Sequence, residues 1–327
     1  MKKEFNIKEF LINYGVILVM IVLVVFTSIK SPNFLSGSNL MNLLLNMSSR
    51  LVIALGIAGC VITAGCDLSA GRMIGLGGCI AGVLLQRADY AGKFYPDMQP
   101  LNIFAAVVIV MCITALFGSV TGFFIAFLNV PPFISTLAMM EIVYGLNLLY
   151  TNATPLGGYV EDYTNLATKR FLFIPWLVWI AILIAAISWF IFNMTRHGKY
   201  MYAIGANPQA AEVAGVPVKL TMVMIYAKAA AFYGLAGFML GAKSGGASVN
   251  LGLGYEMEAI AACTIGGVSV TGGRGKVSSA IIGVCVFELL KAALQFLGVD
   301  ANAQWIALGV IIYIAISLDI RKYVAKK

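Results

Sequence analysis

The stretch TRHGKYMYAIGANPQAAEVAGVP, residues 195–217, decides the fold class that the sequence predicts, because it is a long basic interruption in an otherwise mostly apolar chain. Asn207 suits an N-cap, and Pro208 suits a first helical turn, where its missing N–H would have no helical partner. Gly215 ends the pattern. The stretch therefore predicts a short capped helix over 209–214 that is exposed to water.

Positive charge follows the apolar run that ends near Asn193. Arg196, His197 and Lys199 stand where that run would leave the bilayer. Lys and Arg concentrate at the cytoplasmic ends of membrane helices. Residues 195–218 are therefore predicted to form a cytoplasmic loop.

The composition is that of a membrane protein. Of 327 residues, 61% are hydrophobic and 11% are charged, with a mean hydropathy of +0.92, whereas soluble domains are about 45–50% apolar. The net charge of +8 lies at the ends of apolar runs and at both termini, as orientation signals do, so nucleic-acid binding is not expected. We predict an all-α polytopic membrane protein.

Apolar stretches long enough to cross about 30 Å of hydrocarbon predict about ten membrane helices. They lie near residues 11–29, 49–65, 72–86, 101–127, 133–151, 173–193, 219–241, 257–270, 277–297 and 302–319. With this count both termini are cytoplasmic. Residues 38–49 are too short to cross and are expected to form an interfacial or re-entrant helix. The whole chain, 1–327, is expected to be one transmembrane domain.

Many of the 34 glycines form small-x-x-x-small pairs, which let helix backbones approach closely in lipid. The pairs are Gly71 with Gly75, Gly78 with Gly82, Gly118 with Gly122, and Gly237 with Gly241. We expect a tight bundle. Residues 62–85 and 267–290 resemble each other, which reflects either a parallel internal repeat or chance similarity of glycine-rich apolar sequence.

The sequence contains no catalytic constellation. His197 is the only histidine, which excludes H-E-x-x-H and argues against an imidazole-based triad. The run GGRGK, 272–276, lacks the first glycine of a phosphate loop at Val270 and the Mg²⁺-binding hydroxyl at Val277. The six cysteines form no C-x-x-C pair. We therefore expect no enzyme, no metal site and no resident cofactor; any ATP is used by a partner.

Charges inside apolar runs are candidates for function, because burying one in hydrocarbon costs roughly 2.5 kcal/mol or more. Glu288 and Lys291 have the spacing to pair on one helix face, and Lys228 stands alone. A polar stripe either lines a water-filled path for a hydroxyl-rich solute or faces a neighbouring helix. The stripe consists of Glu141, Tyr144, Asn147 and Tyr150.

The segment AGCDLSAGR, 64–72, joins the second and third expected spans. Asp67 is placed to N-cap the third span, with its carboxylate at the positive end of the helix dipole. The surrounding glycines also suit a broken helix beside a transport path. Both interpretations remain open.

These motifs resemble the permease subunits of ribose/galactose-type ABC sugar importers over nearly the whole chain. The matching segments are ITAGCDLSAGR (62–72), NVPPFISTLA (129–138), TRHGKYMYAIGANPQAAEVAGVPV (195–218), GYEMEAIAACTIGGVSVTGG (254–273) and SLDIRKYVAKK (317–327). Where the family usually has G-G-I-D-L-S-V-G, this chain has AGCDLSAG at 64–71, which is closer to the galactoside branch. Arg274 and Lys276 make the second turn more basic than usual.

The resemblance implies a homodimer in the bacterial inner membrane that imports galactose, methyl-galactoside or a related hexose such as glucose. A cytoplasmic sugar ATPase would carry the ATP and Mg²⁺, and a periplasmic sugar-binding protein would deliver the sugar. It makes 195–218 the loop that couples to the ATPase, with coupling residues Arg196, Gly198, Asn207, Pro208, Ala211 and Gly215. Candidate path residues are Asp67, Ser69, Arg72, Phe133, Thr136, Glu141, Tyr144 and Asn147.

The main alternative is an ion-coupled secondary sugar transporter that uses Glu141 or Asp67 as its proton or sodium site. An ion-coupled transporter would not explain the capped cytoplasmic helix. An intramembrane enzyme lacks the necessary residues, and a non-transporting membrane scaffold is disfavoured by the polar stripe and the glycine-rich turns.

Overall fold

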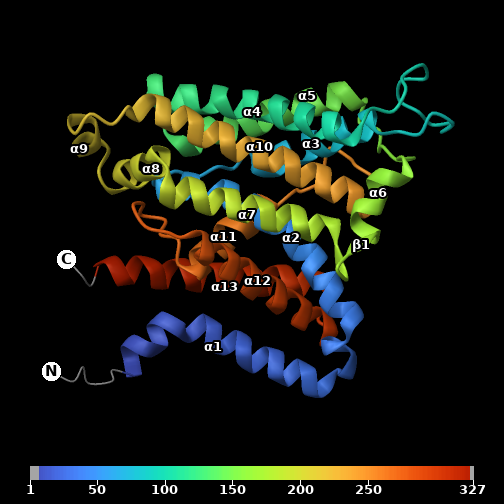
Figure 1. Cartoon of the computed structure of the whole chain (residues 1–327). Coiled ribbons are helices and arrows are strands. Elements are labelled where there is room, and N and C mark those ends of the chain that lie inside the picture. Colours follow the sequence, from blue (N-terminus) through green and yellow to red (C-terminus); the bar gives the residue numbers. More distant parts are fainter. Residues whose placement is uncertain (1–6, 325–327) are drawn as a thin grey trace.

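Helices form most of the computed structural model, which describes residues 7–324 (Figure 1). Residues 1–6 and 325–327, with part of the basic ends, lie outside the described residues. A helix lies at each predicted span: α1 Ile7–Lys30, α2 Gly37–Ile62, α3 Ala70–Leu84, α4 Ile103–Phe127, α5 Pro132–Thr151, α7 Trp176–Met194, α10 Val218–Ser244, α11 Tyr255–Gly266, α12 Val277–Phe296 and α13 Ala301–Val324. The shorter elements are η1 Pro32–Leu35, α6 Glu161–Thr168, β1 Arg170–Phe171, β2 Ile174–Pro175, α8 Arg196–Ala206 and α9 Pro208–Val213.

Among the described residues, 6 helices are long and apolar enough to cross a membrane: α2, α4, α5, α7, α10 and α12. Shorter apolar helices lie within α1, α3 and α13. The chain is therefore an all-α multi-pass membrane protein, as predicted. The count of about ten spans remains a prediction.

The expected separate helix over 38–49 is wrong, because these residues form the first half of α2. Ser36 caps α2 by accepting a hydrogen bond from the Asn39 amide at 3.3 Å. Ser48 donates to the carbonyl of Leu45 at 2.7 Å, so its hydroxyl is satisfied within the helix. The 26 residues of α2 extend about 39 Å, which is longer than the hydrocarbon core. The polar half interrupts the apolar pattern without interrupting the helix.

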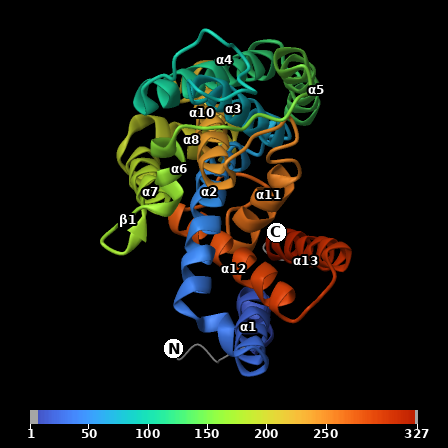
Figure 2. The same ribbon diagram turned by 90° about the vertical axis from the view of Figure 1, so that its right-hand side faces the viewer.

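α10 lies at the centre of the bundle and packs against α4, α3 and α2 (Figures 1 and 2). Glycines bring the backbones together there. An ideal Cβ on Gly77 would lie 2.7 Å from the Cα of Gly234, and one on Gly237 would lie 2.7 Å from the Gly78 nitrogen and still closer to the Ile74 carbonyl. The predicted tight glycine-rich bundle is confirmed at these helix contacts.

The two ends of the bundle carry different structures. α8 and α9 lie at the end of the bundle where α1 begins and α13 ends (Figure 1). α6 and the β1–β2 hairpin lie at the opposite end. The two glycine-rich turns 63–69 and 267–276 meet near α8, because the Gly273 amide donates to the Ile62 carbonyl at 2.8 Å. The internal repeat itself remains a prediction.

We predict that Gly237→Ala lowers the free energy of unfolding by about 1–3 kcal/mol, because its methyl group would overlap the α3 backbone. Equilibrium unfolding in detergent measures the change. The control is Gly145→Ala in α5, where an ideal Cβ has no neighbour within 4 Å. Equal unfolding free energies for the two variants would show that the α3–α10 contact is looser than described.

Candidate functional site

A buried polar turn separates α2 from α3. The Asp67 carboxylate is 1% exposed, and its Oδ1 accepts hydrogen bonds from the Ser69 amide at 3.0 Å and the Ser69 hydroxyl at 2.6 Å. Ser69, rather than Asp67, occupies the N-cap position of α3. The expectation that Asp67 caps this helix is therefore wrong: its carboxylate closes the turn two residues earlier. Ala64 opens the turn with a φ of 57°.

Side chains from α5 and α10 surround this turn. Thr136 of α5 is buried and donates to the Cys66 carbonyl at 3.3 Å. The Tyr233 hydroxyl of α10 lies beside the Asp67 carboxyl group, yet neither it nor the Tyr226 hydroxyl has a well-formed hydrogen bond among the described residues. Several polar groups thus converge on one buried turn.

A second set of polar contacts continues along the α3–α5 interface. The Arg72 guanidinium lies over the Tyr144 ring, 3.8 Å from its centroid, and its Nη1 donates to Asn250 Oδ1 at 3.0 Å. Asn147, one turn further along α5, is 1% exposed and lies beside the Cys79 thiol, yet neither its amide oxygen nor its amide nitrogen has a well-formed hydrogen bond among the described residues. Buried amides are rarely left unpaired, so this position is one that a polar ligand or water would satisfy.

The structure brings together most of the predicted path residues. Asp67, Ser69, Arg72, Thr136, Tyr144 and Asn147 follow the turn and the α3–α5 interface. Phe133 and Glu141 do not join them, because both lie exposed on the outer side of α5.

The predicted coupling loop consists of two helices. Thr195 caps α8 by accepting from the Gly198 amide at 3.2 Å, so Arg196 and Gly198 belong to a helix where the sequence predicted only a basic loop. Asn207 caps α9 by accepting from the Ala210 amide at 3.0 Å. The predicted capped helix is confirmed, with its start one residue earlier than expected, at Pro208.

α9 presents apolar residues to solvent, of which Val213 is the largest aliphatic side chain. Ala211 faces inward and is 4% exposed, whereas Val213 is 91% exposed. Gly215 follows with a φ of 82°, the left-handed conformation that favours glycine, and returns the chain toward α10. Pro208, Ala210 and Val213 together give this short capped helix an exposed apolar surface that is suited to contact another protein.

α8 contacts the turn 267–276 and the end of α2 through close backbone packing and one tyrosine hydroxyl, a contact that we name the backbone junction. The Gly273 amide donates to Ile62 O at 2.8 Å, and the Tyr202 hydroxyl donates to Gly275 O at 2.8 Å. An ideal Cβ on Gly205 would lie 2.6 Å from the Gly273 nitrogen. The run GGRGK is therefore a structural connection between α8 and the end of α2.

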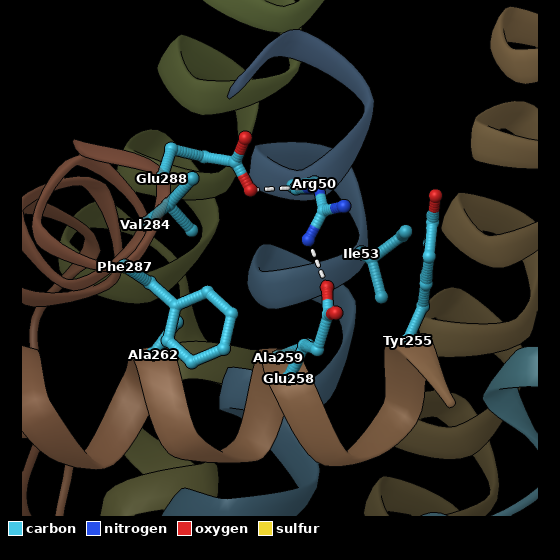
Figure 3. Close-up of a pocket in the computed structure, with 9 residues that line it drawn as sticks. All are labelled: Arg50, Ile53, Tyr255, Glu258, Ala259, Ala262, Val284, Phe287 and Glu288. Atoms are coloured by element: carbon cyan, nitrogen blue, oxygen red, sulfur yellow. Dashed lines mark hydrogen bonds and ion pairs between the residues drawn. The ribbon is translucent and has the colours of Figure 1, made fainter. Parts of the chain in front are cut away.

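A cluster of ion pairs joins α2, α11 and α12 (Figure 3). Arg50 pairs with Glu258, and its Nε lies 2.7 Å from Glu288 Oε1. Lys291 Nζ lies 2.9 Å from Glu258 Oε1. The Arg50 guanidinium also lies over the Tyr255 ring, 4.6 Å from its centroid. Paired in this way, the charges tolerate burial.

The cluster differs from the prediction in its partners. Glu288 and Lys291 were expected to pair with each other, but each pairs with a residue on another helix. Arg50 and Glu258 were missed, although each is a charge inside an apolar run, which was the available signal. The pocket beside them leaves about 10 Å³, room for one water rather than a sugar, so the cluster is structural.

We predict that Arg50→Met costs about 3–5 kcal/mol of unfolding free energy, because it leaves Glu258 and Glu288 buried without the guanidinium that they share. The control is Arg87→Met, whose partner Asp89 is 3.7 Å away and mostly exposed, with an expected loss of no more than about 1 kcal/mol. Denaturation in detergent compares them. Similar losses would contradict the structural role of the cluster.

The single histidine lies where α8 approaches α10. Burial, and after it the positive charge of Lys228, lower the pKa of His197 to about 4. The Lys228 ammonium is itself buried over the Phe192 ring at 4.5 Å, without a hydrogen-bond partner among the described residues. His197 is therefore neutral in the folded protein at neutral pH.

This depressed pKa predicts a sign for the dependence of stability on pH. The unfolded chain binds a proton near pH 6.5, whereas folded His197 resists it down to about pH 4, so stability falls as the pH drops through this window. We expect His197→Gln to lose less thermal stability than the parent between pH 7 and pH 5 in the same detergent. Identical losses of thermal stability in the variant and the parent would show that the His197 side chain is more hydrated than described.

Comparisons with known proteins agree with this architecture. Residues 39–316 match the family described as "Branched-chain amino acid transport system / permease component". The galactose/methyl galactoside import permease protein MglC of Escherichia coli K12 is 42% identical over 96% of this chain and 95% of its own. MglC of Haemophilus influenzae is 39% identical, covering 99% and 98%. The ribose import permease protein RbsC of E. coli K12 is 32% identical, covering 98% and 97%.

No solved structure matches the chain. The resemblance to ribose/galactose-type permeases that the sequence motifs indicated is confirmed. Since both the family match and the relatives cover nearly all of the sequence, the chain belongs to this family of transport-system permease components.

Proposed function

We propose that this chain is the membrane permease subunit of an ATP-driven ABC importer that carries a monosaccharide into the bacterial cytoplasm. Galactose, methyl-galactoside or a related hexose is the proposed cargo, since the relatives at 42% and 39% identity are galactose/methyl galactoside import permeases. The observation that carries the proposal is the exposed helix pair α8–α9, joined by the backbone junction to the buried turn at Asp67.

The proposed topology has ten spans with both termini and the pair α8–α9 in the cytoplasm. The shared end of α8, α9, α1 and α13 supports it (Figure 1). Basic residues at that end, including Arg196 and Lys199, agree with cytoplasmic placement.

The exposed side of α5 supports the proposal of a homodimer. Glu141 lies near the middle of this 20-residue helix and is exposed in the single chain. A carboxylate facing lipid at that depth would cost roughly 2.5 kcal/mol or more. We therefore place a second copy against the side of α5 that carries Glu141 and Phe133.

The sugar path runs beside the α3–α5 interface in this proposal. Asn147 offers an unpaired donor and an unpaired acceptor, and Arg72 and Tyr144 add a cation and a ring. Sugar hydroxyls both donate and accept hydrogen bonds, so these groups match them. The chain performs no covalent chemistry; ATP and Mg²⁺ bind the partner ATPase.

Delivery takes place at the opposite end of the bundle. The loops there are joined by backbone hydrogen bonds, with Leu156 and Ala247 exchanging a pair at 2.8 and 2.9 Å. The adjacent segments 159–170 and 246–256 are the proposed docking surface of the periplasmic sugar-binding protein.

Closure of the ATPase dimer would move α9 and α8 together. The backbone junction passes this displacement to Ile62, from which the chain continues into the turn that holds Asp67. Close backbone packing at Gly205, together with the hydrogen bond from Tyr202 to Gly275, leaves α8 little freedom to move without the turn and the end of α2. The turn moves with α8, and the α3–α5 interface then rearranges to release the sugar inward.

Reconstitution tests the proposal. The chain, its ATPase and its binding protein are placed in liposomes, and uptake of labelled galactose is measured with ATP alone and with a proton or sodium gradient alone. Uptake should require ATP and the binding protein. Uptake driven by a gradient without ATP would instead support an ion-coupled transporter using Asp67 or Glu141.

In this assay we predict that Val213→Asp lowers uptake at least tenfold, because it places a charge at the proposed ATPase contact. The variant should keep the parent's thermal stability, since Val213 is 91% exposed and contributes little to the folded chain. The matched control, Val213→Ile, should retain uptake and ATPase binding. Normal uptake by Val213→Asp would show that α9 is not the coupling surface.

A further inference from the structure

The hairpin that precedes α7 has an unusual turn. β1 and β2 pair Arg170 with Pro175 and Phe171 with Ile174, which leaves Leu172 and Phe173 as a two-residue loop. Their φ angles are 48° and 66°. Such turns strongly favour Asn and Gly, because bulky side chains are strained at positive φ. Two large apolar residues at these positions indicate that the tip serves a purpose other than closing the turn.

The tip is apolar, exposed and firmly held. Leu172 is 66% exposed and Phe173 is 86% exposed. Phe171 stacks on Trp176 with ring centroids 5.4 Å apart, and Trp179 Nε1 donates to the Phe171 carbonyl at 3.1 Å. These contacts fix the hairpin to the first turn of α7.

The hairpin lies at the depth of a membrane surface. It directly precedes α7, a helix long and apolar enough to span the membrane, at the end opposite α8 and α9 (Figure 1). It projects sideways from the bundle (Figure 2). Lys169 and Arg170 are exposed beside the aromatic residues. Trp with Lys and Arg is typical of the headgroup layer.

A groove runs between the hairpin, α6 and the start of α2. It holds about 320 Å³ of free space, in the range of small-ligand sites. Arg170, Thr168, Ser38 and Asn42 supply its polar lining. Met41 and Leu45 of α2 add an apolar wall. A phosphate bound to the polar side and an attached acyl chain along the apolar wall would match this lining.

We propose that the hairpin and groove form a phospholipid site in the leaflet opposite α8 and α9. Leu172 and Phe173 enter the boundary between headgroups and acyl chains, and Arg170 binds the lipid phosphate. One acyl chain lies along Met41 and Leu45. A lipid fits better than a soluble protein, because the tip points sideways into the membrane plane and not along the helix axes.

Photocrosslinking in the full transporter complex tests the tip. Benzoylphenylalanine replaces Phe173, in liposomes of phosphatidylethanolamine and phosphatidylglycerol that contain an alkyne-tagged lipid. Phe190, 57% exposed on α7, is the lipid-facing control, and Tyr95, 47% exposed on the loop after α3, is the solvent-facing control. We expect lipid transfer at 173 to match that at 190. Transfer no greater than at 95, or crosslinking to the binding protein in place of lipid, would overturn the proposal.

Native mass spectrometry of the purified complex tests the groove. Arg170→Gln should reduce the number of retained phospholipids by one for each permease chain. Arg87→Gln, an exposed arginine in the loop after α3, should leave the number unchanged. Equal retention by the parent and both variants would remove Arg170 as a phosphate ligand. Stability is expected to be unaffected, because Arg170 is exposed.

Discussion

The hydrogen bond from the Gly273 amide to the Ile62 carbonyl, 2.8 Å long, is the connection on which the structure of this permease depends. It joins the turn after α11 to the last residue of α2, beside α8. Gly272 and Gly273 have φ angles of 88° and 71°, and Gly205 leaves no room for a side chain. The contact is therefore made by backbone alone. In the proposed mechanism α8 and α9 receive the movement of the partner ATPase, and this junction connects them to the buried turn at Asp67.

Helix positions follow from apolar length, and for this reason the sequence predicted them well. A hydrocarbon core about 30 Å thick demands some twenty apolar residues, and each predicted span coincides with a helix. α2 was cut short because Asn46, Ser48 and Ser49 look like an interface. Ser48 and Ser49 satisfy their hydroxyls within the helix, which no hydropathy pattern reveals. The caps at Asn207 and Pro208 were predictable because capping depends on neighbouring residues alone.

Charge partners were harder to predict, because they come from distant parts of the sequence. Glu288 and Lys291 have the spacing of a helical pair, yet Arg50 and Glu258 offer stronger geometry across three helices. Likewise, Asp67 was predicted to cap α3, but its carboxylate accepts hydrogen bonds from Ser69 within the turn that precedes the helix. For the candidate site, the sequence predicted which polar residues lie within or at the ends of membrane helices. Their contacts required the fold.

The buried polar groups of this protein are of two kinds, paired and unpaired. The cluster at Arg50 is paired and encloses almost no free space, so it fixes α11 and α12 to α2. The side chains at Asp67, Tyr233 and Asn147 include groups without well-formed partners. A fully paired cluster favours one arrangement of helices. Unpaired groups can form hydrogen bonds with a transient partner such as a sugar or water. The part of the molecule that moves during transport is therefore expected beside α3 and α5.

The central claim is that α8 and the Asp67 turn move as one body. Electron–electron distance measurements test it directly in the assembled transporter, with nitroxides at the exposed positions 199 and 64, and a second pair at 199 and 172. When the ATPase is trapped with ATP, the distance between 199 and 64 should stay constant while that between 199 and 172 changes. A change between 199 and 64, with the second distance constant, would contradict the account.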